Sequence, residues 1–252
     1  MTARPLGWRA PEELGRAPHR GVRTAAAGLA GLPKRIDLGA LPGVYDQGSV
    51  GSCTAQALAG AIETLAARSY YRPERPDRPA LYRRERDAIG YPDEDSGAIL
   101  ADGIAALRRG WEPEAEHPTS WGPAWLRAAP RLDASAPRLV SAEPLDYDPD
   151  SIAWELACGH PVAVGLRITD QWDRPGTTLD APAGPSTGGH AVLLVGYDAP
   201  ASMWRVRNSW GADWGDGGYV WLPWSWTAAP WCGEAWSLRA IRRADAPALG
   251  GV

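Results

Sequence analysis

Three short segments of this chain carry the side chains of a thiol acyl-transfer site. Cys53 is a candidate nucleophile, and His190 is a candidate base that would activate its thiol. Asn208 would hold one ring nitrogen of His190 by a hydrogen bond and turn the other toward sulfur. Gln47, six residues before Cys53, would donate an N–H to an oxygen that becomes negative in a tetrahedral intermediate. Together these residues predict attack of a thiol on a carbonyl and a thioester intermediate.

The thiol must be ionised to react, because the thiolate and not the thiol is the nucleophile. Apolar residues recur at helical spacing from Cys53 to Ala67, which predicts a helix that begins at Cys53, with Ser52 as its N-cap. The N-terminal end of a helix and a nearby imidazolium both favour an anion. We therefore expect the pKa of Cys53 to be lowered.

Taken singly, each of these residues has a simpler interpretation. A free cysteine usually packs as a small hydrophobe, and a strand histidine is usually a satisfied core group. The combination of Cys53 with Gln47, His190 and Asn208 favours catalysis over packing. Of the three cysteines, the other two lack such partners, and we interpret Cys158 and Cys232 as structural.

The segments around the four candidates resemble the papain (C1) family of cysteine peptidases. Cys53 precedes His190 by 137 residues, and His190 precedes Asn208 by 18. Papain-like enzymes separate the cysteine from the histidine and asparagine by about 130–150 residues. The resemblance implies the same four roles for Gln47, Cys53, His190 and Asn208. The segments that carry it are residues 46–55, 188–192 and 208–219.

The resemblance extends over about residues 33–242 and implies roles for four further residues. Trp210 matches the indole that shields the Asn–His hydrogen bond from water, and Trp214 matches an apolar wall on the leaving-group side. Ser96 and Gly97 match a loop that pairs with the substrate backbone, where a missing side chain at Gly97 allows close approach.

The chain also departs from the family pattern. Thr54 follows the nucleophile where an aromatic residue is usual, Val50 stands at a common disulfide position, and Ser96 replaces a glycine. No long helical propeptide is recognised before the domain. These departures indicate a bacterial-type member without disulfides, and Thr54 puts the leaving-group subsite in question.

The order of elements predicts an α+β fold, because helical patterns come first and strand-like runs later, without βαβ alternation. The resemblance implies two lobes, an N-terminal mainly helical lobe and a C-terminal antiparallel β lobe, with the active-site cleft between them. We expect an irregular extension over residues 1–32, a helical lobe over 33–120, a β lobe over 121–245 and a tail over 246–252. Predicted helices span 53–67, 98–109 and 148–156; predicted strands span 161–168, 190–197, 203–207, 218–222 and 236–241.

Composition narrows the class of protein. A net charge of −4 gives no reason to expect nucleic-acid or membrane binding, and no run reaches the roughly eighteen apolar residues of a membrane helix. Without phenylalanine, the fourteen tryptophans must help to fill the core. Three cysteines without a metal or disulfide spacing favour a reducing, cytoplasmic location over secretion. We expect no metal or organic cofactor.

The predicted function is peptide-bond hydrolysis, with a peptide or protein as substrate and endopeptidase action because the groove between the lobes would be open for an extended peptide. Two alternatives remain at this point. One is acyl transfer on a narrower amide substrate, by a dedicated leader-peptide maturation peptidase, a ligase or an amidase. The other is a non-catalytic binding module that retains the fold. The sequence leaves the side-chain preference and the oligomeric state open.

Overall fold

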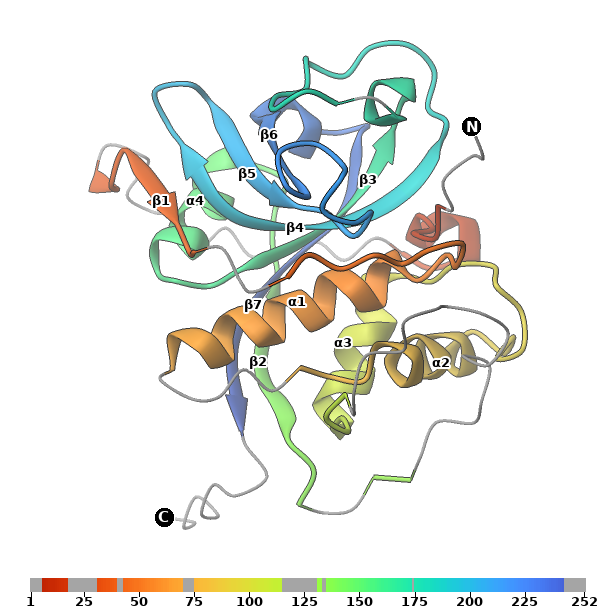
Figure 1. Ribbon diagram of the computed structural model, residues 1–252. Helices are drawn as coiled ribbons and strands as arrows, with labels where there is room; N and C mark the ends of the chain where they lie inside the picture. Colours follow the sequence, from red (N-terminus) through yellow and green to blue (C-terminus); the bar gives the residue numbers. More distant parts are fainter. Residues whose placement is uncertain are drawn as a thin grey trace.

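The computed structural model describes residues 6–17, 31–39, 43–69, 75–114, 131–132, 135–173 and 175–242. The described part is an α+β fold with two lobes, as predicted (Figure 1). The first half contributes helices α1 (Cys53–Arg68), α2 (Arg78–Ala88) and α3 (Leu100–Arg109). The other elements are η1 (Pro11–Leu14), β1 (Arg35–Asp37), β2 (Arg138–Pro144), α4 (Pro149–Ala157), β3 (Val162–Ile168), η4 (Asp170–Asp173), β4 (Gly188–Asp198), β5 (Met203–Arg207), β6 (Tyr219–Pro223), η5 (Trp224–Thr227) and β7 (Cys232–Arg242).

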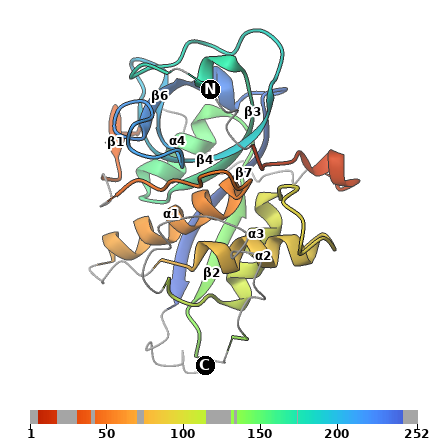
Figure 2. The same ribbon diagram turned by 45° about the vertical axis from the view of Figure 1, so that its right-hand side comes forward.

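The seven strands form one antiparallel sheet with the order β2-β7-β3-β4-β5-β6, and β1 pairs with β4. In the central pair of β3 and β4, Leu166 lies opposite His190. This register places His190 at the N-terminal end of β4. The long strands β2 and β7 continue beside α1 and α3, so the sheet reaches into the helical lobe (Figures 1 and 2).

Helix α1 lies between the sheet and the other two helices (Figure 2). Its residues from Cys53 to Ala66 are all buried. The helix is rich in alanine, which has the highest helix propensity and lets neighbours approach closely. Gly60 illustrates this, because an added Cβ would lie 3.0 Å from the guanidinium of Arg207 and 3.3 Å from Leu193. Burial on all sides fixes the first turn of α1 against the β lobe.

Several sequence predictions are confirmed at the level of elements, and others differ. The predicted helices and strands match α1, α3, α4 and β3 to β7 within a few residues. For residues 68–93, which include α2, the sequence predicted only a solvated, partly helical connection, and strands β1 and β2 were not predicted. Ser52 does not cap α1 with its side chain; its hydroxyl accepts from Gln56 Nε2 at 3.2 Å instead. The predicted lobe boundaries near 120 and 245 lie outside the described residues.

Helix α2 is stabilised by an N-cap and a buried face, which are difficult to recognise in its arginine-rich sequence. Asp77 caps it by accepting from the Ala80 N–H at 2.9 Å, and a proline lies in the first turn, where its missing N–H costs nothing. Leu81 and Tyr82 are buried together with Arg78 and Arg86, while the other arginines of the helix are partly exposed. No helix among the described residues is long and apolar enough to cross a membrane.

Candidate active site

The first turn of α1 meets the start of β4, and this contact brings the predicted nucleophile beside the predicted base. Cys53 is fully buried, and its Sγ accepts a hydrogen bond from the backbone N–H of Ala191 at 3.3 Å. Ala191 directly follows His190, whose side chain is also fully buried. Segments 137 residues apart in the sequence therefore meet at one point between the lobes.

Asn208 holds the imidazole of His190 in one orientation. The Asn208 Oδ1 lies 2.7 Å from His190 Nε2 and also accepts from the Ser209 N–H at 2.8 Å. A carbonyl oxygen only accepts, so Nε2 carries a proton and donates it to Asn208. The neutral ring then has its lone pair on Nδ1. This is the tautomer required if Nδ1 is to take a proton from the thiol.

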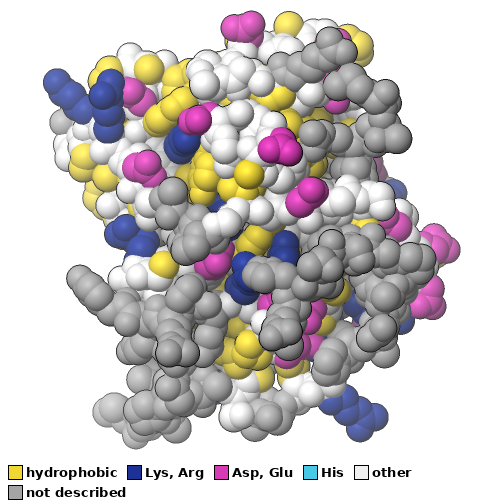
Figure 3. Space-filling view, in the orientation of Figure 1, with side chains coloured by type: hydrophobic (Ala, Val, Ile, Leu, Met, Phe, Trp, Pro, Cys, Tyr) yellow, Lys and Arg dark blue, Asp and Glu magenta, His cyan; other side chains and the backbone are white. Residues whose placement is uncertain are grey.

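Tryptophans enclose the His190 ring. Trp210 stacks on it with ring centroids 4.5 Å apart and planes 26° apart, and Trp172 meets it edge-on at 5.8 Å. Trp210 is 4% exposed and covers one face of the ring. Trp214 is also buried, stacks on Trp172 at 5.8 Å and donates its indole N–H to the Trp172 carbonyl. In the space-filling view of Figure 3, drawn in the orientation of Figure 1, no histidine is visible among the described side chains, as expected for a buried His190.

Gln47 is fixed by bonds to both lobes. Its Nε2 donates to the Val50 carbonyl at 2.8 Å, and its Oε1 accepts from the Ser209 hydroxyl at 2.7 Å. Its backbone N–H also donates to the Ser209 carbonyl. The side chain is fully buried, so its amide has one defined orientation. Ser209, missed by the sequence interpretation, therefore positions both Asn208 and Gln47.

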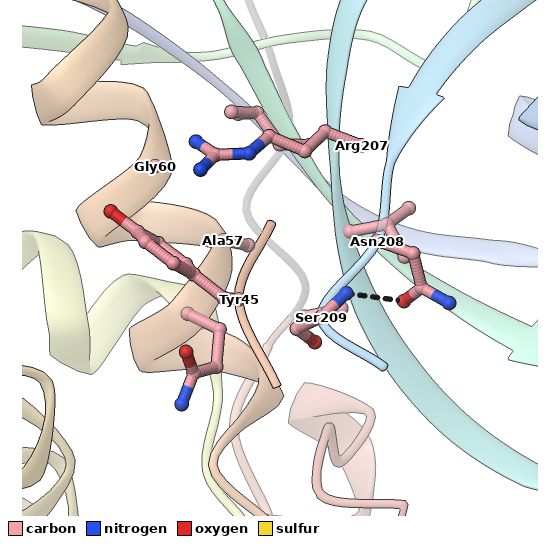
Figure 4. Close-up of a pocket in the computed structure, with 10 residues that line it drawn as sticks. Tyr45, Ala57, Gly60, Arg207, Asn208 and Ser209 are labelled. Carbon is pink, nitrogen blue, oxygen red and sulfur yellow. Dashed lines mark hydrogen bonds between the residues drawn. The ribbon is translucent and has the colours of Figure 1, made fainter. Parts of the chain in front are cut away.

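A small pocket lies behind the Asn208 turn (Figure 4). Arg207 points across it toward α1 and Tyr45, while the Asn208 amide points to the opposite side. The Arg207 guanidinium donates to Glu63 Oε2 at 3.1 Å from both NH groups and lies 4.3 Å from the Tyr45 ring centroid. Tyr45 also donates its hydroxyl to Glu63 at 2.9 Å. This buried cluster joins α1 to β5 one residue before Asn208.

The predicted loop at Ser96 and Gly97 is held by Arg86, which sequence reasoning did not single out. The Arg86 guanidinium donates to the Ser96 hydroxyl and to the Gly97 carbonyl, and to two further carbonyls of the loop. Gly97 has φ +76° and donates its N–H to the Tyr82 hydroxyl at 3.1 Å. Asp95 accepts from the Gly51 N–H at 3.0 Å, which ties this loop to the nucleophile segment.

The N-terminal segment of residues 6–9 runs over the nucleophile. Gly7 accepts from the Ala98 N–H at 2.7 Å, and Arg9 donates to the Ala98 carbonyl at 2.9 Å. Gly7 lies so close to the nucleophile loop that an added Cβ would sit 1.7 Å from the Gly51 carbonyl oxygen. A backbone hydrogen bond from Gly7 also reaches Cys53. Residues 7–9 are thus seated in the site.

The prediction of a lowered pKa at Cys53 was wrong for this arrangement. Burial raises the pKa of Cys53 to about 12, although backbone hydrogen bonds from Ala191 and Gly7 lower it. Without access to water, the thiolate is destabilised by desolvation more than hydrogen bonds from neutral amides stabilise it. In this structure Cys53 is therefore a thiol.

Thr54, the departure next to the nucleophile, turns away from the β lobe. It is buried and donates its hydroxyl to Glu85 Oε2 at 2.6 Å. Burial, opposed by this hydrogen bond, raises the pKa of Glu85 well above its usual range. Thr54 therefore anchors α1 to α2.

Comparison with known proteins agrees with this geometry. The family described as "Papain family cysteine protease" matches residues 134–239. The crystal structure of xylellain, a cysteine protease from Xylella fastidiosa, superposes with a TM-score of 0.83 at 28% identity over 96% of this chain and 99% of that one. These matches support a papain-like (C1) cysteine peptidase, which is a hydrolase.

Sequence relatives fit the same assignment. An uncharacterised peptidase C1-like protein of Acanthamoeba polyphaga mimivirus is 29% identical over 80% of this chain and 70% of its own length. Cysteine proteinase 2 of Leishmania pifanoi is 30% identical over 79% of this chain, which spans under half (46%) of that protein. Bromelain of Ananas comosus, solved with the E64 inhibitor, has a TM-score of 0.65 at 20% identity and supports the fold alone.

Proposed function

We propose that this protein hydrolyses peptide bonds through Cys53, His190, Asn208 and Gln47, and that it acts as an endopeptidase. The observation that carries the proposal is the bond from His190 Nε2 to Asn208, together with the position of Cys53 Sγ against the next residue of β4. An imidazole held in this tautomer beside a cysteine at a helix start is the arrangement that thiol acyl transfer needs.

In the first half of the reaction, the Cys53 proton passes to His190 Nδ1 and the sulfur attacks the substrate carbonyl carbon. The carbonyl oxygen becomes negative, and the Gln47 amide and the Cys53 backbone N–H donate to it. As the first residue of α1, Cys53 has an N–H without an intrahelical acceptor. The C–N bond then breaks, His190 returns the proton to the leaving amine, and a thioester remains.

In the second half, His190 accepts a proton from a water molecule that attacks the thioester carbon. The C–S bond breaks, the acyl group leaves as a carboxylic acid, and the thiol of Cys53 is restored. Asn208 keeps Nε2 as the donor through both halves, while Trp210 excludes water from that bond. Substrate backbone would pair with the loop of Ser96 and Gly97, and Trp214 would support the leaving-group side through Trp210 and Trp172.

Access to the site requires the segment of residues 6–9 to move. With that segment in place Cys53 is fully buried, so no peptide carbonyl can approach its sulfur. The segment is held mainly by backbone bonds to Ala98 and Gly189, which a substrate backbone can replace. We infer that residues 6–9 act as a cover over the site between the helical and β lobes.

The test is the Cys53→Ala variant of the full-length protein, assayed on a mixed peptide library with mass-spectrometric detection of cleavage sites. Loss of the nucleophile should lower turnover by about 10⁴-fold or more. Cys158→Ala, which removes the exposed cysteine, is the matched control and should retain full turnover. Cleavage by the Cys53→Ala protein at an unchanged rate refutes the mechanism. Cleavage at internal bonds, rather than only at peptide ends, distinguishes endopeptidase action.

A further inference from the structure

The segment of residues 6–9 pairs with a single residue of the loop beside the nucleophile, Ala98. The Ala98 N–H donates to the Gly7 carbonyl at 2.7 Å, and the Ala98 carbonyl accepts from the Arg9 N–H at 2.9 Å. These two bonds form a parallel bridge between Ala98 and Trp8. An extended peptide in place of the segment would find the same donor and the same acceptor. The loop therefore presents the backbone of Ala98 to the site.

Both backbone groups of Gly97, the preceding residue, are bonded inside the helical lobe. Its N–H donates to the Tyr82 hydroxyl at 3.1 Å, and its carbonyl accepts from the Arg86 guanidinium. The φ of +76° at this position is one that glycine adopts without strain. Since a backbone N–H is a single donor, the bond to Tyr82 occupies it. The backbone groups that remain for a peptide are those of Ala98.

Arg86 on α2 fixes this loop through four acceptors. Its side chain is fully buried. The guanidinium donates to the Glu94 carbonyl at 2.7 Å and to the Tyr91 carbonyl at 3.0 Å. It also donates to the Ser96 hydroxyl and to the Gly97 carbonyl. One side chain can serve so many acceptors because the five N–H donors of arginine form a rigid planar fork, which lysine lacks.

Tyr82, about one turn earlier on α2, links the loop to the nucleophile segment. Its hydroxyl accepts from the Gly97 N–H and donates to Asp95 Oδ1 at 2.7 Å. Asp95 also accepts from the N–H of Gly51, two residues before Cys53, at 3.0 Å. The ring of Tyr82 is fully buried, so its hydroxyl has a fixed position. The position of the loop relative to Cys53 therefore depends on this hydroxyl group.

We propose that Tyr82 and Arg86 are positioning residues for substrate binding. They hold both backbone groups of Gly97 inside the helical lobe, so that the N–H and carbonyl of Ala98 pair with the backbone of a bound peptide. The inference rests on the proposed peptidase function. Both residues act through Gly97 and neither contacts the reacting atoms. Their loss should weaken pairing with the substrate backbone and leave the chemistry at Cys53 unchanged, which a loss of general stability would not do.

The test uses the full-length Gly7→Ala protein, in which an added Cβ 1.7 Å from the Gly51 carbonyl oxygen displaces the segment from Ala98. A peptide substrate is compared with analogues in which one amide, other than the scissile amide, is replaced by an ester that lacks the N–H. At one position kcat/KM should be about tenfold higher for the amide, because the ester leaves the Ala98 carbonyl without a donor. Adding Tyr82→Phe should reduce this ratio to about two or less.

Tyr197→Phe is the matched control, because it also removes a hydroxyl that donates to a backbone carbonyl, that of Pro33 at 2.8 Å. It should preserve the ratio. Arg86→Lys keeps the charge but removes the fork, so it should reduce the ratio as well. Its control is Arg108→Lys, since the Arg108 guanidinium donates to the Ala142 carbonyl at 2.8 Å on another strand. In the affected variants KM should rise, while kcat stays within about twofold.

Circular dichroism establishes that each variant is folded before its rates are compared, and Tyr82→Phe decides alone if Arg86→Lys does not fold. An amide-to-ester ratio near one at every position of the Gly7→Ala protein overturns the proposal. A ratio that survives in Tyr82→Phe or in Arg86→Lys overturns the role assigned to that residue.

Peptidyl chloromethyl ketones separate this inference from the function on which it rests. In their reaction the Cys53 thiol loses its proton, the sulfur attacks the methylene carbon, chloride leaves and a thioether forms, without cleavage of an amide. Faster alkylation by an amide reagent than by its ester counterpart, with a difference that Tyr82→Phe removes, supports the positioning role even if no peptide is hydrolysed. In that case peptide hydrolysis fails and the positioning assignment stands. Equal alkylation rates for the two reagents overturn the assignment.

Discussion

The two walls of the candidate site, one from the β lobe and one from the helical lobe, differ in how far their side chains are already in a reactive state. On the β-lobe wall, His190 is bonded to Asn208 and stacked on Trp210, so its tautomer and orientation are fixed. On the helical-lobe wall, Cys53 lies under Gly7, and burial keeps the pKa of its thiol high. The orientation of the His190 ring and the ionisation of the Cys53 thiol are therefore controlled by different parts of the structure. The sheet fixes the orientation of the proposed base, whereas the protonation state of the proposed nucleophile depends on the segment that covers it.

The largest expected effect concerns the contact that joins the two walls. Arg207→Met leaves Glu63 buried without its main cation, and breaking a buried pair costs about 3–5 kcal/mol of unfolding free energy. Urea unfolding followed by circular dichroism measures this loss. Arg205→Met, on the same strand, is the control, since its partner Asp216 is half exposed and such pairs contribute about 0–1 kcal/mol. Equal losses in both variants would show that the walls are not joined through Arg207.

Removal of the orienting amide should affect only the β-lobe wall. Asn208→Ala deletes the acceptor of the His190 Nε2 proton, so we expect kcat/KM to fall about a hundredfold, within the usual contribution of general acid–base catalysis. The pH dependence of kcat/KM is the measurement that isolates this role. Gln171→Ala removes an amide on η4 and should change neither rate nor pH profile. An Asn208→Ala profile identical to that of the unchanged protein contradicts the assignment.

The smallest effect is expected when the segment over Cys53 on the helical-lobe wall is displaced, and this change should increase the reactivity of the thiol. Gly7→Ala would place its Cβ 1.7 Å from the Gly51 carbonyl oxygen, so the segment must lift and Cys53 becomes hydrated. Its pKa then falls below about 12, and more thiolate exists at pH 7 to 8. Alkylation by iodoacetamide should become about tenfold faster for each unit by which the pKa falls, and the rate should rise at lower pH than before.

The control for that experiment is Gly31→Ala, at a position where an added Cβ meets nothing within 4 Å. Its alkylation rate should match that of the unchanged protein. If Gly7→Ala also leaves the rate and its pH dependence unchanged, the segment does not control the nucleophile. The two walls would then differ in burial, but this difference would not affect the reactivity of Cys53.

Local patterns predicted the elements that depend on local rules. The α1 helix follows from apolar residues at helical spacing, and α4 follows from Asp148, whose side chain accepts from the Asp150 and Ser151 N–H groups. At α2 the sequence indicated only a partly helical connection, because the arginines obscure the buried face of Leu81 and Tyr82. Strand β2 was missed because its pairing with β7, about a hundred residues away, decides it.

The residues of the candidate site also fall into two groups, those that local motifs indicate and those that only long-range contacts reveal. Cys53, His190, Asn208 and Gln47 could be predicted as site residues because their types and spacing carry a recognisable chemistry. Ser209 adjoins a recognised motif, yet its role appears only in its contact with Gln47. Tyr82 gave no signal, since its role depends on contacts with Asp95 and Gly97. The same holds for Arg86, which acts through carbonyl oxygens of a loop.

The sequence by itself determined the family, the α+β class and the residues that can perform thiol chemistry, because these depend on residue type and spacing along the chain. The tertiary structure alone decided that the nucleophile is a buried thiol and that both backbone groups of Gly97 are held by side chains of α2. Desolvation depends on every atom within reach of the sulfur, and no pattern of neighbours in the chain specifies those atoms. The sign of the Cys53 pKa shift was wrong from sequence for that reason.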